Sequence, residues 1–267
     1  MSVKKIFKDT YCLTDKGPAG TVKFFLLVGS ERALLIDTGY GTIDLPSVIR
    51  EITDKPITVA LTHGHLDHAG GAYLFDDVYM HSADAEVYKK HSSEKFLKEN
   101  YAKARKHSLK KHEISAETLI SAEKKLPKPL EGISEFDLGN RKIRWCHIPG
   151  HTHGCCAFID TTNKIAFTGD MLSVCIWLQL PESLSLDAYK TSILQLKQGL
   201  AKVDVQYIYP AHWFRVKGAK LIDKFCNLVE AVKNNKASRR VVNNPADGGA
   251  LSGTLYGKGG VYLVKKD

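Results

Sequence analysis

The chain has 267 residues, of which 43% are hydrophobic and 25% are charged, and this composition predicts a globular protein with a substantial core. The longest apolar runs, such as residues 24–28 and 174–180, are far shorter than the roughly 20 residues of a membrane-spanning helix, so no membrane span is expected. The formal net charge of +9 suits nucleic acid, anionic lipid or a small anionic substrate, and does not choose among these partners.

The first predicted elements are short apolar strands that alternate with helices. Strands are expected at residues 23–29 and 32–39, joined by a turn, and a short helix is expected at residues 45–52. A β-branched strand at residues 56–62 then leads into the segment LTHGHLDHAGG at residues 61–71. Polar loops at strand ends are positions where side chains from different strands converge on a site.

Much of the positive charge lies in a stretch between Ala85 and Lys125 that contains neither Pro nor Gly. It predicts one or two helices within a basic insertion at about residues 83–126. One interpretation is a solvated helical face. The other is a lid over a cleft, with an apolar side formed by Tyr88, Phe96, Leu97, Tyr101 and Leu109.

The second half of the chain continues the alternation. Strands are expected at residues 142–150, 164–170 and 205–212, and an amphipathic helix at residues 185–203. The Gly-rich C-terminus at residues 248–267 ends in a strand that would form a sheet edge or a pocket rim. It lacks the Lys-Ser/Thr pattern of a phosphate-binding loop.

Three histidines and an aspartate fall within six positions in the first half: His63, His65, Asp67 and His68. Neutral imidazole and carboxylate are the ligands that zinc and similar metals bind at about 2 Å. One loop rarely supplies a complete ligand set, so further ligands are expected elsewhere. Three candidates follow apolar strands beside Gly or Pro: His151, Asp170 and His212.

The blocks HxHxDH, PGHT, TGD and PAH occur in this order, and together with LLIDTG they resemble the motifs of the metallo-β-lactamase superfamily over residues 34–212. The resemblance implies an α/β (α+β) fold, a four-layer αββα sandwich of two mixed β-sheets flanked by helices. It also implies a single domain over residues 1–267 that carries the basic helical insertion.

The resemblance further implies a centre of two divalent metal ions, with zinc favoured and iron or manganese compatible. One ion would be held by His63, His65 and His151 and the other by Asp67, His68 and His212, with Asp170 bridging them. The nucleophile would be a bridging hydroxide, available at neutral pH because the metals lower the pKa of water. Asp67 and Asp170 are the candidate catalytic carboxylates, and Asp37 is expected to support a ligand histidine.

Asp170 favours the branch that contains glyoxalase II-like thioesterases, lactonases and phosphodiesterases, because true β-lactamases generally lack this bridging carboxylate. The leading hypothesis is a metal-dependent hydrolase of a small ester, thioester or lactone. Alternatives are a phosphodiesterase or nuclease, a mononuclear iron persulfide dioxygenase, and a metal-stabilised binding protein without catalysis.

Four residues are candidates for contacts with the substrate, each with a simpler alternative. Trp177 and Leu178 would form an apolar wall or part of the core. Arg215 would bind a carboxylate or phosphate, or form a surface ion pair. His153 stands where many relatives have proline, and it would be an extra ligand, a substrate contact or a loop residue.

The six cysteines form no CxxC pair and are expected to be reduced thiols. The N-terminus lacks the apolar stretch of a secretory signal, so a cytoplasmic location is expected. A small-molecule substrate is the expected partner, nucleic acid is disfavoured because no recognition module is evident, and the oligomeric state is open.

Overall fold

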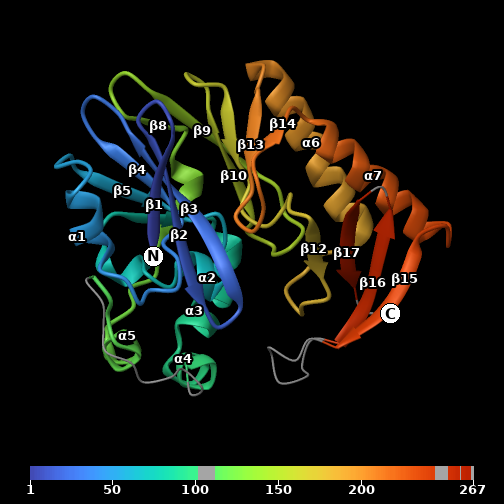
Figure 1. Ribbon diagram of the computed structural model, residues 1–267, viewed down its shortest axis with the longest axis horizontal. Coiled ribbons are helices and arrows are strands. Elements are labelled where there is room, and N and C mark those ends of the chain that lie inside the picture. Colours follow the sequence, from blue (N-terminus) through green and yellow to red (C-terminus); the bar gives the residue numbers. More distant parts are fainter. Residues whose placement is uncertain (102–111, 244–251, 259, 266–267) are drawn as a thin grey trace. The chain divides into compact units, whose positions relative to one another are not determined.

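The computed structural model of the protein describes residues 1–101, 112–243, 252–258 and 260–265 (Figure 1). The chain forms two compact units, Met1–Lys142 and Ile143–Asp267. Among the described residues, no helix combines the length and apolar character needed to cross a membrane. The single domain over residues 1–267 stays a prediction.

The first unit is built on a seven-stranded mixed sheet in which spatial order follows chain order. Its strands are β1 (Ser2–Phe7), β2 (Thr10–Gly17), β3 (Gly20–Val28), β4 (Ala33–Ile36), β5 (Ile57–Ala60), β6 (Val78–Met80) and β7 (Lys128–Pro129). Strands β1 to β4 pair antiparallel, and β4 to β7 pair parallel. All four residues of β4 are buried, as expected for a strand covered on both faces. The strands predicted at residues 23–29, 32–39 and 56–62 are confirmed.

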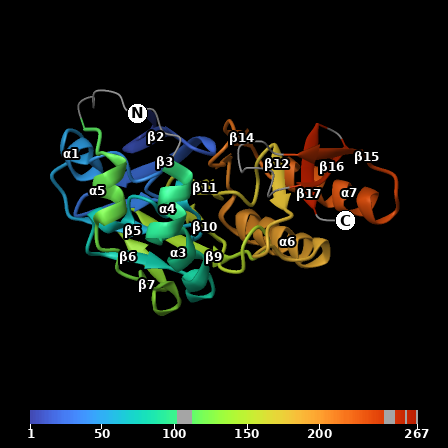
Figure 2. The ribbon, with the colours of Figure 1, turned by 90° about the horizontal axis from the view of Figure 1, so that it is seen from below.

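The helices of the first unit are short. They are α1 (Leu45–Arg50), α2 (Leu66–Ala69), α3 (Ala85–Ser92), α4 (Glu94–Tyr101) and α5 (Ala116–Ser121), with 3₁₀ turns η1 (Ala72–Leu74), η2 (Ser82–Asp84) and η3 (Leu130–Gly132). Helix α1 begins after Asp44, whose carboxylate accepts a hydrogen bond from the Ser47 amide. In Figure 2, α3, α4 and α5 lie beside one another.

The basic insertion contains three helices in its described part, so the expected one or two helices were wrong in number. The break between α3 and α4 has a local cause, because Ser93 adopts an extended conformation and its hydroxyl accepts a hydrogen bond from the Phe96 amide. Of the predicted apolar side, Tyr88, Leu97 and Tyr101 are buried. Leu109 lies outside the described residues.

The second unit contains strands of two further mixed sheets. The six-stranded sheet has the order β14-β13-β11-β10-β9-β8, formed by β8 (Glu135–Asp137), β9 (Lys142–His147), β10 (Cys156–Asp160), β11 (Ile165–Phe167), β13 (Tyr207–Tyr209) and β14 (Val216–Lys217). The four-stranded sheet has the order β12-β17-β16-β15, formed by β12 (Cys175–Leu178), β15 (Ser238–Asn243), β16 (Ser252–Lys258) and β17 (Val261–Lys265). Two mixed sheets were expected, and this C-terminal sheet is an addition to them.

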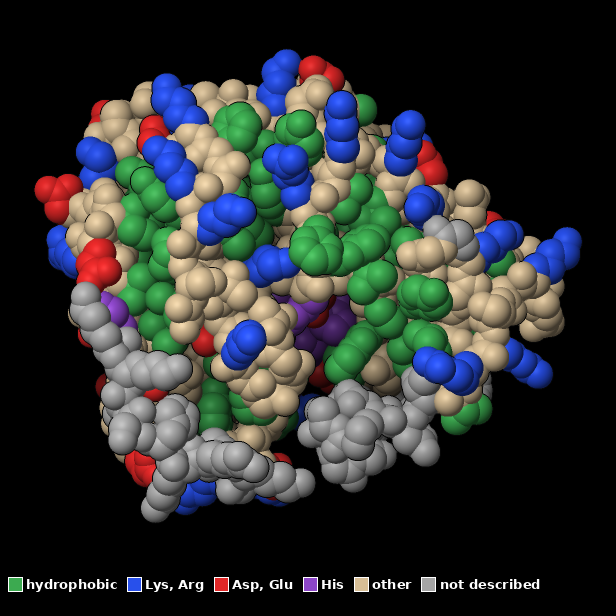
Figure 3. All heavy atoms as spheres, viewed as in Figure 1, with side chains coloured by type: hydrophobic (Ala, Val, Ile, Leu, Met, Phe, Trp, Pro, Cys, Tyr) green, Lys and Arg blue, Asp and Glu red, His purple; other side chains and the backbone are tan. Residues whose placement is uncertain are grey.

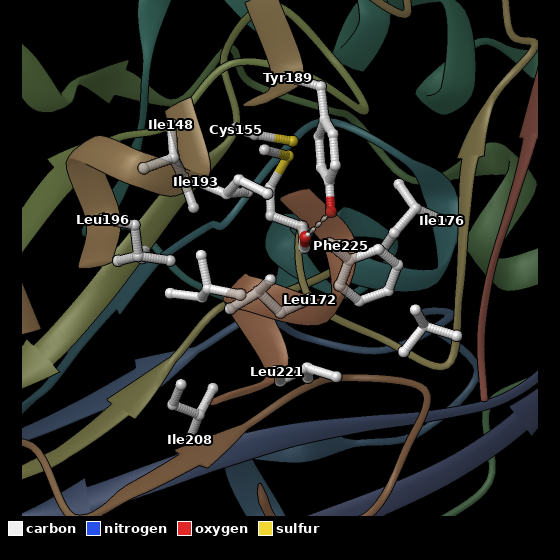
Figure 4. Close-up of a cluster of buried hydrophobic side chains, with 14 of the residues drawn as sticks. Ile148, Cys155, Leu172, Ile176, Tyr189, Ile193, Leu196, Ile208, Leu221 and Phe225 are labelled. Carbon is white, nitrogen blue, oxygen red and sulfur yellow. Dashed lines mark hydrogen bonds between the residues drawn. The ribbon is translucent and has the colours of Figure 1, made fainter. Parts of the chain in front are cut away.

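Two long amphipathic helices, α6 (Leu186–Val203) and α7 (Lys220–Lys233), pack against each other and supply much of the core of the second unit. Helix α6 matches the predicted helix at residues 185–203. Ser185 caps it by accepting a hydrogen bond from the Ala188 amide, and Asp204 ends it in a left-handed conformation. Figure 4 shows the core cluster, in which the Tyr189 hydroxyl donates a 3.0 Å hydrogen bond to the Met171 carbonyl.

Candidate metal centre

The candidate ligands of the first unit follow the carboxyl end of β5. Because β4 and β5 are parallel neighbours, with Ile36 opposite Ala60, the residues after both strands emerge at the same sheet edge. This places Asp37, after β4, against Thr62, after β5. The topology therefore brings a carboxylate to the base of the histidine-rich loop.

The Asp37 carboxylate accepts three hydrogen bonds. They come from the Thr62 amide at 2.7 Å, from the Thr62 hydroxyl at 2.8 Å and from His68 Nδ1 at 2.8 Å. Because the Thr62 hydroxyl donates its one hydrogen to the bond with Asp37, it accepts a hydrogen bond from His63 Nδ1 at 3.1 Å. Both imidazoles are thereby fixed with Nδ1 protonated and with the lone pair on Nε2, the form that binds a metal.

The nitrogen and oxygen atoms of the histidine-rich loop that could donate a lone pair to a metal lie in two close pairs. We call each such set of two neighbouring atoms a donor pair. His63 Nε2 lies 3.1 Å from His65 Nδ1, and His68 Nε2 lies 3.6 Å from Asp67 Oδ2. The three histidines are buried, whereas Asp67 is half-buried. One loop thus presents two neighbouring pairs of ligand atoms.

The candidate ligands of the second unit follow β9, β11 and β13. Strands β11 and β13 are parallel, with Phe167 opposite Tyr209, and β9 runs in the same direction because both β9 and β11 pair antiparallel with β10. The residues that follow these strands therefore share one sheet edge. His151, Asp170 and His212 emerge there.

Asp170 lies between the two histidines. Its Oδ2 is 3.5 Å from His151 Nε2, and its Oδ1 is 3.3 Å from His212 Nε2. His151 is buried, and the other two side chains are half-buried. Each carboxylate oxygen thus faces a different imidazole, as a bridging ligand requires.

His151 is held in place by its own loop, by Met171 after β11 and by Trp177 within β12. Its Nδ1 donates a 2.7 Å hydrogen bond to the Trp177 carbonyl, which leaves the lone pair on Nε2. Its amide donates to Met171 Sδ at 3.3 Å. A Cβ at Gly150 would lie 2.7 Å from Met171 Cε and 2.9 Å from Tyr189 Cδ2, so a larger residue before this histidine would have to displace the Met171 and Tyr189 side chains.

These separations test whether the residues suit a metal. Two ligand atoms bound at about 2.1 Å to a tetrahedral ion lie about 3.4 Å apart. The four pairs in the two units have separations of 3.1 to 3.6 Å. Donor chemistry and spacing therefore fit, and histidine-rich groups that could hold a metal ion occur in the described residues.

Two buried tyrosines stand behind the histidine-rich loop. The Tyr101 hydroxyl donates a 2.8 Å hydrogen bond to the Tyr40 carbonyl. Burial raises the pKa of both hydroxyls far above the usual value, and the Asp67 carboxylate raises the pKa of Tyr40 further. Both phenols therefore stay neutral at physiological pH.

The four candidate substrate residues lie in different environments. Leu178 belongs to the buried core of the second unit, and Trp177 is half-buried beside it in β12. The Arg215 guanidinium lies over the Tyr207 ring at 4.3 Å. His153 is exposed, and its carbonyl accepts a 2.7 Å hydrogen bond from His147 Nε2.

Three residues that hold the histidine-rich loop in place were not predicted from the sequence. Thr62 orients His63 and Asp37, as described above. Asp84 and His91 reach the same loop from η2 and α3. A threonine directly before the HxH block was a readable signal, whereas the other two meet the loop only through the tertiary fold.

Comparisons with known proteins identify the family of the chain. A sequence model of the metallo-beta-lactamase superfamily matches residues 17–212. The human acyl-coenzyme A thioesterase MBLAC2 (Homo sapiens) is 29% identical over 220 residues, which cover 73% of this chain and 74% of the relative. The hydroxyacylglutathione hydrolase GloC of Haemophilus influenzae is 31% identical over 144 residues, covering 53% of this chain and 62% of the relative.

Solved structures show the same fold. The metallo-beta-lactamase FIM-1 from Pseudomonas aeruginosa gives a TM-score of 0.59 at 16% identity, covering 86% of this chain and 95% of that one. The metallo-beta-lactamase from Pontibacter korlensis gives 0.57 at 18% identity, covering 86% and 98%. The predicted α/β fold class, with mixed sheets and flanking helices, is confirmed. With a family match that spans most of its length, this chain belongs to the metallo-beta-lactamase superfamily.

Proposed function

We propose that the chain is a hydrolase that depends on two metal ions and cleaves small thioesters, within the broader class of ester, thioester and lactone substrates. The single observation that carries this proposal is the set of four donor pairs with separations of 3.1 to 3.6 Å. The pairs are His63 with His65, Asp67 with His68, and Asp170 with each of His151 and His212. This grouping matches the ligand assignment that the superfamily motif implies.

The ligand assignment is part of the proposal. In this assignment His63, His65 and His151 would hold one ion, Asp67, His68 and His212 would hold the other, and Asp170 would be a ligand to both. Two divalent ions bound there would polarise the substrate's carbonyl group and lower the pKa of water enough for it to attack at neutral pH; zinc is favoured, and iron or manganese is compatible.

The residues around the candidate ligands hold the imidazole rings in a fixed orientation. Asp37 and Thr62 hold the rings of His63 and His68 with Nε2 turned to the ligand position. The Trp177 carbonyl does the same for His151. The set is thus aligned before an ion binds, which lowers the cost of assembling the centre.

The relatives support a thioester as substrate. One is named an acyl-coenzyme A thioesterase and another a hydroxyacylglutathione hydrolase. On the face drawn in Figure 3, Lys and Arg side chains are scattered rather than gathered in one patch, which favours a small molecule over a nucleic acid.

A substrate panel with the zinc-loaded protein tests the proposal. We expect turnover of acyl-coenzyme A and acyl-glutathione thioesters, abolished by a chelator. Asp170→Ala should lower kcat by at least about 100-fold because it removes a direct ligand. The control is Asp223→Ala, which removes an exposed acid paired with Lys197 in the same unit and should leave kcat unchanged.

Other outcomes would contradict the proposal. Turnover confined to phosphodiesters would indicate a phosphodiesterase. One bound iron with oxygen uptake would indicate a dioxygenase. Full metal loading with no turnover of any substrate would indicate a binding protein.

A further inference from the structure

The segment formed by η2 and α3 packs directly against the loop that carries His63 and His65. A Cβ at Gly64 would lie 2.8 Å from the Tyr88 amide nitrogen and 3.1 Å from the Asp84 carbonyl oxygen. No larger residue fits between the two histidines without moving the backbone of α3. The position of this segment therefore fixes the path of the loop.

Asp84 holds the amide that precedes His65. Its side chain is 0% exposed, and its Oδ2 accepts a 2.8 Å hydrogen bond from the Gly64 amide. Hydrogen bonds to a charged acceptor are among the stronger ones in proteins. The peptide between the two histidines is thus fixed in orientation.

His91 holds both the amide that follows His65 and the His65 ring. Its Nδ1 accepts a 3.2 Å hydrogen bond from the Leu66 amide. Its ring stacks on that of His65, with centroids 4.6 Å apart and planes at 27°. The Phe96 ring lies against His91 with a centroid distance of 4.2 Å.

We propose that Asp84 and His91 are positioning residues that orient the His65 ring and its backbone for metal binding. The amides on both sides of His65 are bound by side chains from one segment, and the ring rests against His91, which in turn contacts Phe96. This inference rests on the metal centre of the proposed function, and it adds residues to which the superfamily motif assigns no role.

Zinc affinity, measured by competition with a chromophoric chelator, tests the inference without any substrate. His91→Ala should weaken zinc binding by about 10- to 100-fold, the usual effect of losing a partner of a metal ligand. His91→Phe keeps the stacked ring and His91→Asn keeps an acceptor, so each should lose less. Asp84→Asn, which keeps an oxygen acceptor, should bind zinc more tightly than Asp84→Ala.

A second readout separates positioning from general damage to the fold. The visible absorption of the cobalt-substituted protein should change in His91→Ala, while the melting temperature of the metal-free variant stays close to that of the wild type. Lys90→Ala, an exposed neighbour on α3, is the matched control and should change neither property.

Three results would overturn the inference. Unchanged zinc affinity and cobalt spectrum in His91→Ala would show that the ring does not position His65. Loss of a whole metal equivalent would show that His91 is itself a ligand. A wild-type protein that binds no zinc would remove the metal centre, and with it both the proposed function and this inference.

Discussion

Asp37 orients two of the candidate ligand histidines of the first unit. It contacts His68 directly and reaches His63 through Thr62. Its backbone φ of 64° lies in the left-handed region, which aspartate and asparagine tolerate better than most residues. Both the side-chain hydrogen bonds and the backbone conformation therefore favour aspartate at this position.

Asp37→Ala should weaken zinc binding by about 10- to 100-fold and destabilise the fold by about 1–3 kcal/mol, because the buried Thr62 amide loses its acceptor. Chelator competition and urea denaturation measure the two effects. Asp37→Asn preserves the backbone preference and one acceptor oxygen, so it should retain more of both properties. An alanine variant with unchanged zinc affinity would contradict the orienting role.

Two cysteines should react slowly with alkylating reagents. Burial raises the pKa of Cys146 and of Cys175 to about 11, so at neutral pH both remain thiols rather than reactive thiolates. We expect alkylation roughly 100-fold slower at pH 7.5 than in the chain unfolded by guanidinium, with the rate rising as pH approaches 11. Mass spectrometry of labelled peptides measures this, and equal rates in both states would contradict it.

The residues of the candidate centre were predictable from sequence because chemistry and position coincide. His63, Asp170 and His212 are polar side chains shortly after apolar strands, with Gly or Pro within two positions, and few structural roles require that combination. Asp84 and His91 offered no such signal. Asp84 lies 20 residues from Gly64, and only the folded arrangement of η2, α3 and the loop brings them together.

Parallel strand pairs explain why polar residues that are far apart in the sequence lie close together in each unit. Both β4–β5 and β11–β13 deliver their following residues to one sheet edge. The apolar runs predicted these strands, and Ser185 marked the start of α6. Pairing was not predictable in the same way. β12 is a short run whose partner is β17 near the C-terminus, and tertiary packing selects that partner.

The contact between α6 and the residues after β11 links core packing to the centre. The fully buried Tyr189 donates to the Met171 carbonyl, and Met171 follows Asp170 and also accepts from the His151 amide. The ring of Tyr189 meets that of Phe225 from α7 edge to face at 6.2 Å. The packing of α6 and α7 thus supports the loops that carry His151 and Asp170.

Tyr189→Phe should lower the free energy of unfolding by about 1–3 kcal/mol, because the hydroxyl that satisfies the Met171 carbonyl is lost while the ring remains. Chemical denaturation followed by circular dichroism measures the change. Tyr262→Phe is the control, since that side chain is 40% exposed and should have little effect. Equal stability of the two variants would show that the hydrogen bond contributes little.

For the whole molecule, each unit contributes two donor pairs of the proposed assignment. The formal net charge of +9 already subtracts the acids, so ion pairs such as Lys89–Glu86 and Lys98–Glu94 leave this excess unchanged. The positive excess therefore does not by itself identify a partner.

We propose that hydrolysis requires two metal ions bound by these candidate ligands. The most direct test of this proposal is to titrate zinc into the metal-free protein while measuring the hydrolysis of an acyl-coenzyme A thioester. We predict that activity rises to a plateau when two equivalents are bound. A plateau at one equivalent, or two bound ions without any hydrolysis, would contradict the two-metal proposal.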